Sequence, residues 1–159
     1  PMPPYDQLTD WRWPEVELES ELTRLIDQLS PGTIVSFGDV ARALGDVVAA
    51  SWVARRCAAW RAADDARPWQ RLVRQDGSIS GTRDRARHIA RLQAEGHRID
   101  DVGRLIAPIR RLDLISVAPL QHLANWQLAQ SRLVDHTPPP RSPRTLAGLD
   151  VSYPTPDEG

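Results

Sequence analysis

The sequence predicts a mainly α-helical fold: a winged helix-turn-helix domain with a small β-hairpin wing, followed by a C-terminal helix-and-strand appendage. Three observations predict it. Apolar residues recur at helical spacing near the start, a capped short helix leads through a glycine turn into an arginine-bearing helix, and an Asp-Gly turn separates two β-prone runs. We place the first domain at residues 12–107 and the second at residues 118–159.

The first expected helix spans residues 15–29, where one stripe carries the apolar residues Leu18, Leu22, Leu25, Ile26 and Leu29. The segment Ser30-Pro31-Gly32 ends it. A second, short helix is expected over residues 37–44, because Ser36 and Asp39 have the spacing of a capping box. Gly45 stands where glycine commonly ends a helix.

A third helix is expected over residues 51–61, with either Ser51 or Asp46 as its N-cap. Helical spacing places two sets of side chains on different faces of it: Val53, Cys57 and Trp60 on one, and Trp52, Arg55 and Arg56 on the other. A short helix, a glycine turn and a second helix with an arginine face are typical of a helix-turn-helix.

The wing is expected from residues 71–74 and 78–80, which flank Gln75-Asp76-Gly77. A further helix is expected over residues 83–95, and residues 97–106 are expected to form a small pair of extended strands.

The C-terminal appendage begins with an expected helix over residues 120–134. A proline-rich spacer follows at residues 136–143, and an apolar strand is expected over residues 146–153.

The formal net charge of −1 conceals an uneven distribution. Residues 1–49 contain three arginines and nine acidic residues, and residues 112–159 contain three and five. Residues 50–111, in contrast, contain fourteen arginines and seven acidic residues. A basic middle between acidic ends predicts a localised phosphate-binding face, with a solvated helix surface as the alternative.

Composition sets the remaining expectations. A chain of 159 residues with 41% hydrophobic and 26% charged residues is ordinary for a globular protein. No apolar run reaches the roughly 18 residues that a membrane span needs, so no membrane association is expected. The single cysteine excludes an intrachain disulfide and suits a reducing compartment. We therefore expect a cytoplasmic protein, associated with the nucleoid if the source is bacterial or archaeal.

Two sequence blocks carry a resemblance. Residues 29–45 read LSPGTIVSFGDVARALG, and residues 68–81 read PWQRLVRQDGSISG. Together they resemble the C-terminal DNA-binding domain of the O6-alkylguanine-DNA alkyltransferases. The enzymes carry Pro-Cys-His-Arg-Val at the reactive position, whereas the non-enzymatic alkyltransferase-like branch carries Pro-Trp-His-Arg-Val. Trp69 therefore stands at the acceptor position, where the enzymes have their cysteine.

The resemblance implies a protein that binds double-stranded DNA and flips an O6-alkylguanine into a pocket without transferring the alkyl group. The implied lesion-pocket residues are Trp69, Gln70, Arg71, Ser80, Gly81 and Arg83. The implied DNA-binding residues are Phe37, Ser51, Trp52, Arg55 and Arg56. No cofactor is implied, and other DNA-repair proteins are candidate partners.

Several positions depart from the enzymes' pattern. Gln70 replaces the histidine that helps to deprotonate the cysteine, and Glu95 matches that histidine's glutamate partner. Phe37 replaces a tyrosine that pushes on the phosphate. Trp52 aligns with the arginine that fills the gap left by the flipped base, and Arg55, one turn later, is the alternative for that role.

Each chemical assignment has a plainer structural alternative. Trp69 is either a pocket wall or an ordinary core tryptophan, and Arg83 is either a lesion contact or a solvated helix-start residue. Cys57 is expected to be an inert core thiol. Arg85, Arg87 and Arg91 are expected to be surface charge.

The C-terminal segment carries a second, shorter resemblance. Residues 146–153 read LAGLDVSY, which is similar to an early strand of endonuclease V. The resemblance implies that Asp150 binds magnesium, but only in a complete endonuclease V domain. Two alternatives to a lesion sensor therefore stay open: a DNA-targeting domain of an endonuclease V fusion, and a plain winged-helix DNA-binding module.

Overall fold

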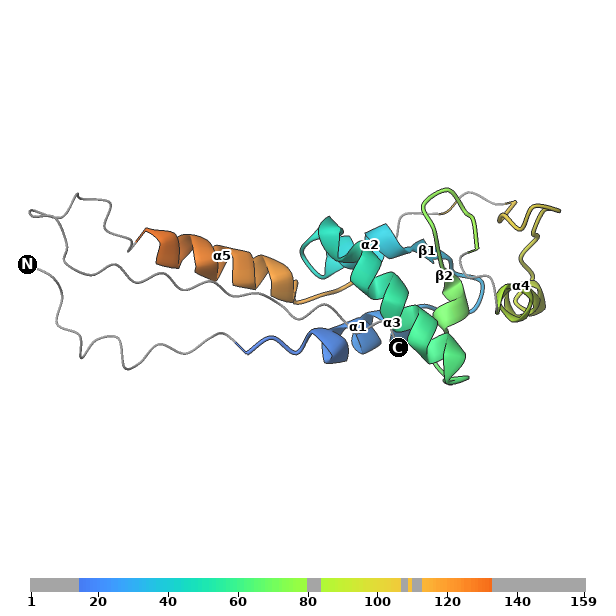
Figure 1. The fold of residues 1–159 in the computed structure, drawn as a ribbon, viewed down its shortest axis with the longest axis horizontal. Helices are drawn as coiled ribbons and strands as arrows, with labels where there is room; N and C mark the ends of the chain where they lie inside the picture. Colours follow the sequence, from blue (N-terminus) through green and yellow to red (C-terminus); the bar gives the residue numbers. More distant parts are fainter. Residues whose placement is uncertain (1–14, 80–83, 107–108, 110–112, 133–159) are drawn as a thin grey trace, which may run out of the picture.

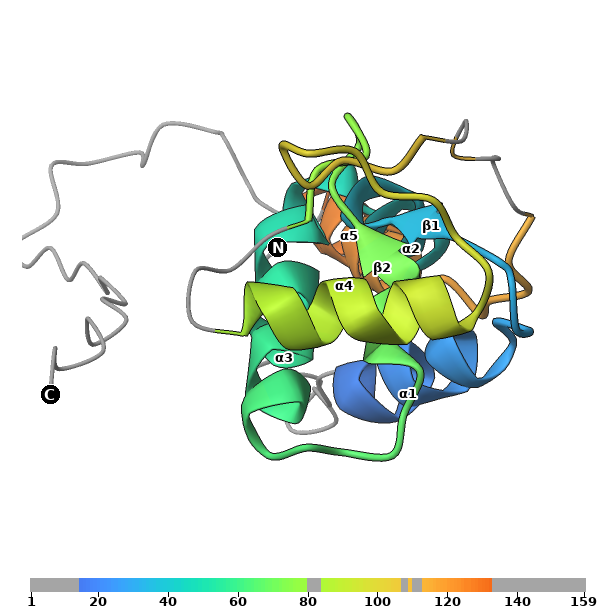
Figure 2. The ribbon, with the colours of Figure 1, turned by 90° about the vertical axis from the view of Figure 1, so that its right-hand side faces the viewer.

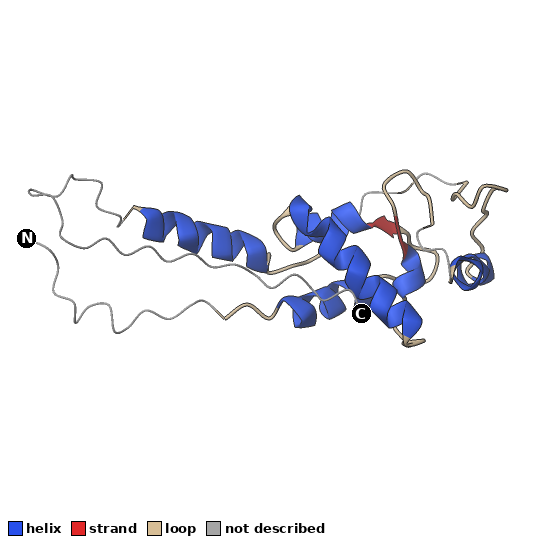
Figure 3. Cartoon of the chain, viewed as in Figure 1, coloured by secondary structure: helices blue, strands red, loops and turns tan. Residues whose placement is uncertain are grey.

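The computed structural model describes residues 15–79, 84–106, 109 and 113–132, and within them the chain is mainly helical (Figures 1 and 3). This confirms the predicted fold class. The elements, in chain order, are α1 (Leu18–Asp27), β1 (Val35–Ser36), α2 (Phe37–Ala43), the 3₁₀ turn η2 (Val47–Ala49), α3 (Ala50–Ala62), the 3₁₀ turn η3 (Trp69–Arg71), β2 (Leu72–Val73), α4 (Arg85–Ala94) and α5 (Pro119–Ser131).

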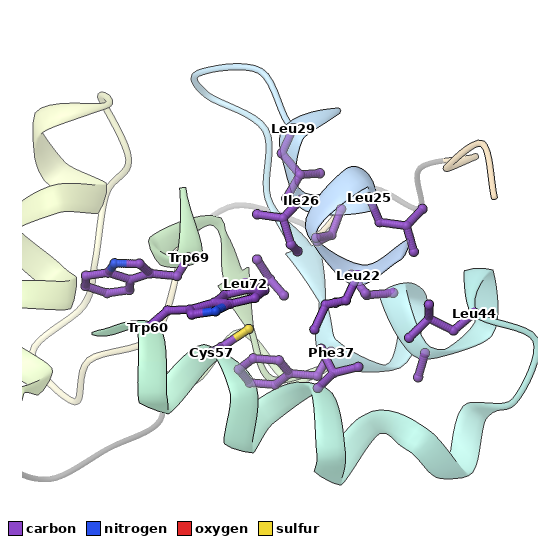
Figure 4. Close-up of a cluster of buried hydrophobic side chains, with 14 residues drawn as sticks. Leu22, Leu25, Ile26, Leu29, Phe37, Leu44, Cys57, Trp60, Trp69 and Leu72 are labelled. Carbon is purple, nitrogen blue, oxygen red and sulfur yellow. The ribbon is translucent and has the colours of Figure 1, made fainter. Parts of the chain in front are cut away.

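The larger hydrophobic core lies between α1, α2 and α3 (Figure 4). The apolar stripe of α1 supplies Leu22, Leu25 and Ile26, all with no exposed surface. Phe37 and Cys57 lie next to each other where α2 meets α3 (Figure 4). Full burial of a large apolar side chain contributes about 1.5–3 kcal/mol, so this cluster fixes how the three helices pack.

Two side-chain caps stabilise the helix-turn-helix, one at the start of α2 and one at the η2 turn before α3. Ser36 Oγ accepts a hydrogen bond from Asp39 N (3.0 Å), and Ser36 N donates to Asp39 Oδ2 (3.3 Å), which confirms the capping box. Asp46 accepts from Val48 N (2.9 Å) and caps the η2 turn that leads into α3. Neither expected N-cap is therefore the cap of α3: that position is Ala49, which makes no side-chain cap, while Asp46 caps the preceding turn and Ser51 lies inside the helix.

Gly45 ends α2 as expected and has a second role. Its φ of +105° is a conformation that favours glycine. A Cβ at this position would also lie 2.4 Å from Gln121 N in α5. Gly45 therefore permits both the turn and the close approach of α5.

The two-stranded sheet is parallel, with Val35 opposite Leu72 and Ser36 opposite Val73. The α2–α3 unit forms the crossover between its strands.

The wing differs from the expected hairpin in its pairing. Arg74 N donates to Ser78 O (3.1 Å) and closes the turn, but Ser78 then forms an antiparallel bridge with Arg104.

Helix α4 crosses in front of β2 in the view of Figure 2 and covers a second, smaller core. That core contains Ile34, Val73, Ile79 and Leu92. After α4, an antiparallel bridge between Ile99 and Leu105 matches the expected pair of extended strands.

Helix α5 extends away from the helix-turn-helix (Figure 1), but the chain leading into it is tied to α1. Glu21 accepts hydrogen bonds from Ser116 Oγ (2.6 Å) and Val117 N (3.0 Å). The hydrogen bonds from Arg24 lower the pKa of Glu21 to about 2, against the effect of burial. The start of α5 is held at Leu44, whose carbonyl accepts from Leu120 N (2.9 Å).

Helix α5 corresponds to the expected helix over residues 120–134, whereas the expected strand over residues 146–153 lies outside the described residues. Among the described helices, none combines the length and apolar character that crossing a bilayer requires.

Candidate functional site

The acceptor position lies in η3, between the end of α3 and β2. The Trp69 side chain is 1% exposed, and its Nε1 donates to the carbonyl oxygen of Asp65 (3.2 Å). In Figure 4 the Trp69 ring points away from the α1 side of the core and toward α4. Trp69 therefore belongs to the core and also forms the boundary between α3 and α4.

Three side chains of α4 contact the Trp69 ring. The Arg91 guanidinium carbon lies 4.8 Å from the ring centroid, and that of Arg87 lies 5.9 Å from it. The His88 ring meets Trp69 edge-on, with centroids 5.4 Å apart and an interplanar angle of 77°. The expectation that Arg87 and Arg91 are surface charge is therefore incomplete, because both are cation–π partners of Trp69.

The two guanidinium groups share one carboxylate. Asp64 Oδ1 lies 2.9 Å from Arg91 Nη2 and 3.2 Å from Arg87 Nη1. Asp64 lies two residues after the end of α3 and has a φ of +51°, a conformation that Asp and Asn tolerate better than most residues. Arg87 also donates to the carbonyl oxygen of Arg61 at the end of α3. The arginines over Trp69 are thus tied to the C-terminus of α3.

Glu95 organises the residues that follow Trp69. It accepts from Gln70 Nε2 at 2.7 Å, from Arg71 Nε at 2.9 Å and from Gly32 N at 3.2 Å. Burial alone would raise the pKa of Glu95, but the hydrogen bonds from Arg71 and Gln70 outweigh it and lower the pKa. Arg71 also donates to the carbonyl oxygen of Leu29. Arg71 therefore anchors this loop to α1 and α4.

Gln70 keeps one unsatisfied group. Its side chain is 8% exposed, and within the described ranges its Oε1 atom is buried with no hydrogen-bond donor. Gln70 thus makes a hydrogen bond to Glu95, but its amide cannot accept a proton as the imidazole of a histidine at this position would.

His88, a residue that the sequence did not single out, supports Gln70 from α4. Its Nε2 lies 2.7 Å from the Gln70 carbonyl oxygen. Burial lowers the pKa of His88 to about 4, so the ring is neutral at pH 7 and donates Nε2–H to that carbonyl. Arg87 and His88 lie four and three residues before Arg91, so helical spacing would have placed both of them beside Arg91.

The only thiol of the chain is poorly suited to nucleophilic chemistry. Cys57 is 5% exposed and lies in the larger core. Burial raises its pKa to about 12, and nearby Arg61 opposes this only in part. Because the thiolate is the reactive form, Cys57 is an inert core residue at neutral pH, as expected.

Helix α3 presents two of the predicted DNA-binding residues to solvent, Ser51 and Arg55. Trp52 is half-buried and packs against the larger core. Arg56 pairs with Glu19 of α1 (3.0 Å). Phe37 is 9% exposed and is a core residue in this structure, so its ring is not at the surface where a phosphate would lie.

The structure thus brings Trp69, Gln70 and Arg71 together with Glu95, whereas Ser80, Gly81 and Arg83 lie outside the described residues. Asp150, the predicted magnesium ligand, also lies outside them. In the described part of the chain, no three His, Cys, Asp or Glu side chains are grouped as metal ligands.

Among the solved structures, this chain is similar to two that are bound to DNA. One is a crystal structure of S. pombe Atl1 in complex with damaged DNA containing O6-carboxymethylguanine, which is 22% identical, covers 56% of this chain and 89% of its own, and has a TM-score of 0.47. The other, S. pombe ATL in complex with DNA, is 21% identical, covers 62% of this chain and 93% of its own, and has a TM-score of 0.45.

A search of curated proteins finds no match. The sequence profile of the 6-O-methylguanine DNA methyltransferase DNA-binding domain, in contrast, matches residues 17–97, which span α1 to the residues just after α4. This stretch is just over half of the chain and includes the helix-turn-helix, Trp69 and Glu95. The chain therefore belongs to the family of the 6-O-methylguanine DNA methyltransferase DNA-binding domain.

Proposed function

We propose that this protein is a non-enzymatic DNA-repair factor that binds double-stranded DNA and recognises O6-alkylguanine without removing the alkyl group. The flipped base would enter a site at Trp69, and the bound protein would mark the lesion for other repair proteins. The observation that carries the proposal is the buried tryptophan at the acceptor position, held in a loop fixed by the Gln70 and Arg71 contacts to Glu95.

The absence of alkyl transfer is supported by chemistry at three positions. An indole at position 69 cannot act as the thiolate nucleophile that alkyl transfer needs. Gln70 cannot act as the base that would generate such a thiolate. Cys57 is buried, with its pKa raised to about 12, so it does not replace the missing nucleophile.

Duplex binding is supported by membership of the family and by the surface of α3. Ser51 and Arg55 are exposed on this helix, and the Arg56–Glu19 pair is partly exposed. Exposed ion pairs are worth only about 0–1 kcal/mol, so Arg56 can exchange Glu19 for a phosphate at little cost. Arginine suits this role because its planar fork binds phosphate oxygens in pairs.

Recognition of a flipped base is supported by the kind of surface that Trp69 offers. An indole provides a large flat face on which a purine can stack, and stacking of one base on an aromatic side chain contributes about 1–3 kcal/mol. The neutral His88 and the Glu95 contacts hold this segment in place from α4. A rigid support of this kind favours selective binding over loose apolar contact.

The test is equilibrium binding to two duplexes that differ by a single O6-methyl group on one guanine. We expect the methylated duplex to bind about tenfold more tightly, which corresponds to 1.4 kcal/mol. Trp69→Phe should reduce this preference, because the smaller ring offers less stacking surface. Trp126→Phe, the same change in α5, should leave it intact.

Equal affinity of the wild-type protein for the two duplexes would exclude lesion recognition and leave a plain winged-helix DNA-binding module. Failure to bind either duplex would exclude the whole proposal.

A further inference from the structure

The Trp69 ring is covered by charged groups. We call Arg87 and Arg91 the arginine cover, because their guanidinium groups lie over the ring at 5.9 and 4.8 Å. The side chains of Arg87 and Arg91 are 37% and 33% exposed. Trp69 is therefore separated from solvent on this side by two partly exposed side chains.

Asp64 holds both members of the arginine cover through weak interactions, and Arg87 is further tied to the Arg61 carbonyl oxygen and to Asp84 (3.5 Å). Both members bind the same oxygen of Asp64, whose side chain is 63% exposed. Ion pairs this exposed contribute about 0–1 kcal/mol, and a cation–π contact at an exposed site adds about 0.5–1 kcal/mol. A phosphate group offers Arg91 a stronger, paired set of charge-assisted hydrogen bonds than a shared carboxylate oxygen does.

We propose that a flipped purine reaches Trp69 by displacing the arginine cover, so that the base takes the place of the Arg91 guanidinium on the indole face. Arg91 then exchanges Asp64 for a phosphate of the bound strand. A planar base replaces a planar cation, so the indole keeps a stacking partner throughout. Arg91 and Asp64 are thus positioning residues that set the preference for the lesion, and this proposal rests on the proposed function.

The proposal predicts opposite effects for the two partners of one ion pair. Asp64→Asn keeps a side chain that tolerates the positive φ but weakens the hold on the arginine cover. We expect it to raise affinity for the O6-methylguanine duplex about threefold more than affinity for the unmodified duplex. Arg91→Ala removes the phosphate contact of the lesion complex, so we expect its loss of affinity to be about fivefold larger for the methylated duplex than for the unmodified duplex.

Matched controls distinguish this exchange from a general effect of charge. Asp101→Asn and Arg98→Ala make the same changes at exposed residues after α4. These variants should shift affinity for both duplexes equally, because phosphate attraction without base contact does not read the lesion. Thermal unfolding of each variant shows that it is folded under the binding conditions.

A direct readout comes from ¹⁹F NMR of the full chain labelled with 5-fluorotryptophan. Trp69→Phe assigns the Trp69 resonance among the six tryptophans. We expect this resonance to move when the methylated duplex binds, and to be displaced already in free Asp64→Asn protein. In the wild-type protein, a resonance that moves with the methylated duplex but not with the unmodified duplex would support base stacking on the ring.

The outcomes separate the two proposals. A wild-type protein with no preference for the methylated duplex refutes the proposed function, and with it the proposed displacement of the arginine cover. Suppose that the wild-type protein prefers the methylated duplex, but that each of Asp64→Asn and Arg91→Ala changes affinity for both duplexes by the same factor. That result overturns the proposed displacement of the arginine cover and leaves the proposed function intact. A Trp69 resonance that does not respond to the methylated duplex, despite preferential binding, overturns the displacement as well.

Discussion

The surface of α3 and the Trp69 site differ in what each offers to a DNA molecule. Helix α3 presents Ser51 and Arg55 to solvent, so contact with a phosphate backbone requires no rearrangement of these side chains. Trp69, in contrast, is 1% exposed and lies beneath Arg87 and Arg91. One surface is available at once, whereas the other becomes available only when side chains of α4 move.

This difference implies that duplex binding and lesion recognition are separable. Changes on α3 should weaken binding to damaged and undamaged DNA alike, since phosphate contacts carry no base information. Changes around Trp69 should alter stability or lesion preference, because this residue is part of the core as well as the proposed site. The following predictions test that separation, beginning with the largest expected effect.

Trp69→Ala should lower the free energy of unfolding by about 3–5 kcal/mol, because it leaves a large cavity in the core. Urea denaturation measures this loss. Trp69→Phe fills most of the cavity and should cost less. A loss below about 1 kcal/mol for Trp69→Ala would mean that the ring is not a core residue and would remove the contrast with α3.

Acid should destabilise the Trp69 side of the molecule through His88. Its folded-state pKa of about 4 lies below its ordinary value of 6.5, so the unfolded chain binds the proton more readily between these values. The stabilisation is therefore fully present above pH 6.5 and is lost as pH falls toward 4. The shift corresponds to about 3 kcal/mol.

Urea denaturation across this pH range measures the His88 effect. His88→Gln should flatten the decline, whereas His122→Gln, at an exposed position in α5, should not. The pKa of Glu21 is lowered to about 2, so the stabilisation that this carboxylate provides is lost at lower pH, between 4.5 and 2. An unchanged decline in His88→Gln protein would assign the acid sensitivity to other groups.

Ser36→Ala should lower the free energy of unfolding by about 1–2 kcal/mol, because it removes the capping box of α2. Ser51→Ala, at an exposed position inside α3, should change it by less than about 0.5 kcal/mol. The ratio of affinities for methylated and unmodified duplexes should be the same in both variants. A changed ratio in Ser36→Ala protein would show that α2 and the Trp69 site are coupled.

Arg55→Ala should weaken binding to both duplexes by the same factor, a few-fold at moderate salt, and should reduce the slope of log affinity against log salt by about 1. Titrations at several salt concentrations measure this slope. Arg132→Ala, just beyond α5, serves as the control. A selective loss for the methylated duplex would place Arg55 in lesion recognition and contradict the separation of the two surfaces.

Local sequence signals predicted the helix-turn-helix well. The Ser36–Asp39 capping box, the positive φ of Gly45 and the buried face of α3 all follow from interactions within a few residues. The sequence predicted the turn of the hairpin but not the pairing beyond it, because Ser78 pairs with Arg104, 26 residues further along the chain. Pairing at such a distance leaves no local signature.

The environment of Trp69 could be predicted only in part. The motif marked Trp69, Gln70 and Arg71 as one group, and the structure adds the contacts of two of them to Glu95. The covering arginines could not be recognised, because exposed charge on α4 has the same appearance in sequence whether or not a tryptophan lies beneath it. The burial of Phe37 likewise depends on how α2 packs against α3.

We propose that this protein holds an O6-alkylguanine without repairing it. The most direct test incubates the full chain, in molar excess, with a duplex that contains one O6-methylguanine, and then measures the nucleosides recovered from the DNA. We predict that the O6-methylguanine is recovered in full while the protein retains the duplex and gains no methyl group. Conversion of the lesion to guanine, with a methyl adduct on Cys57 or any other residue, would contradict this account.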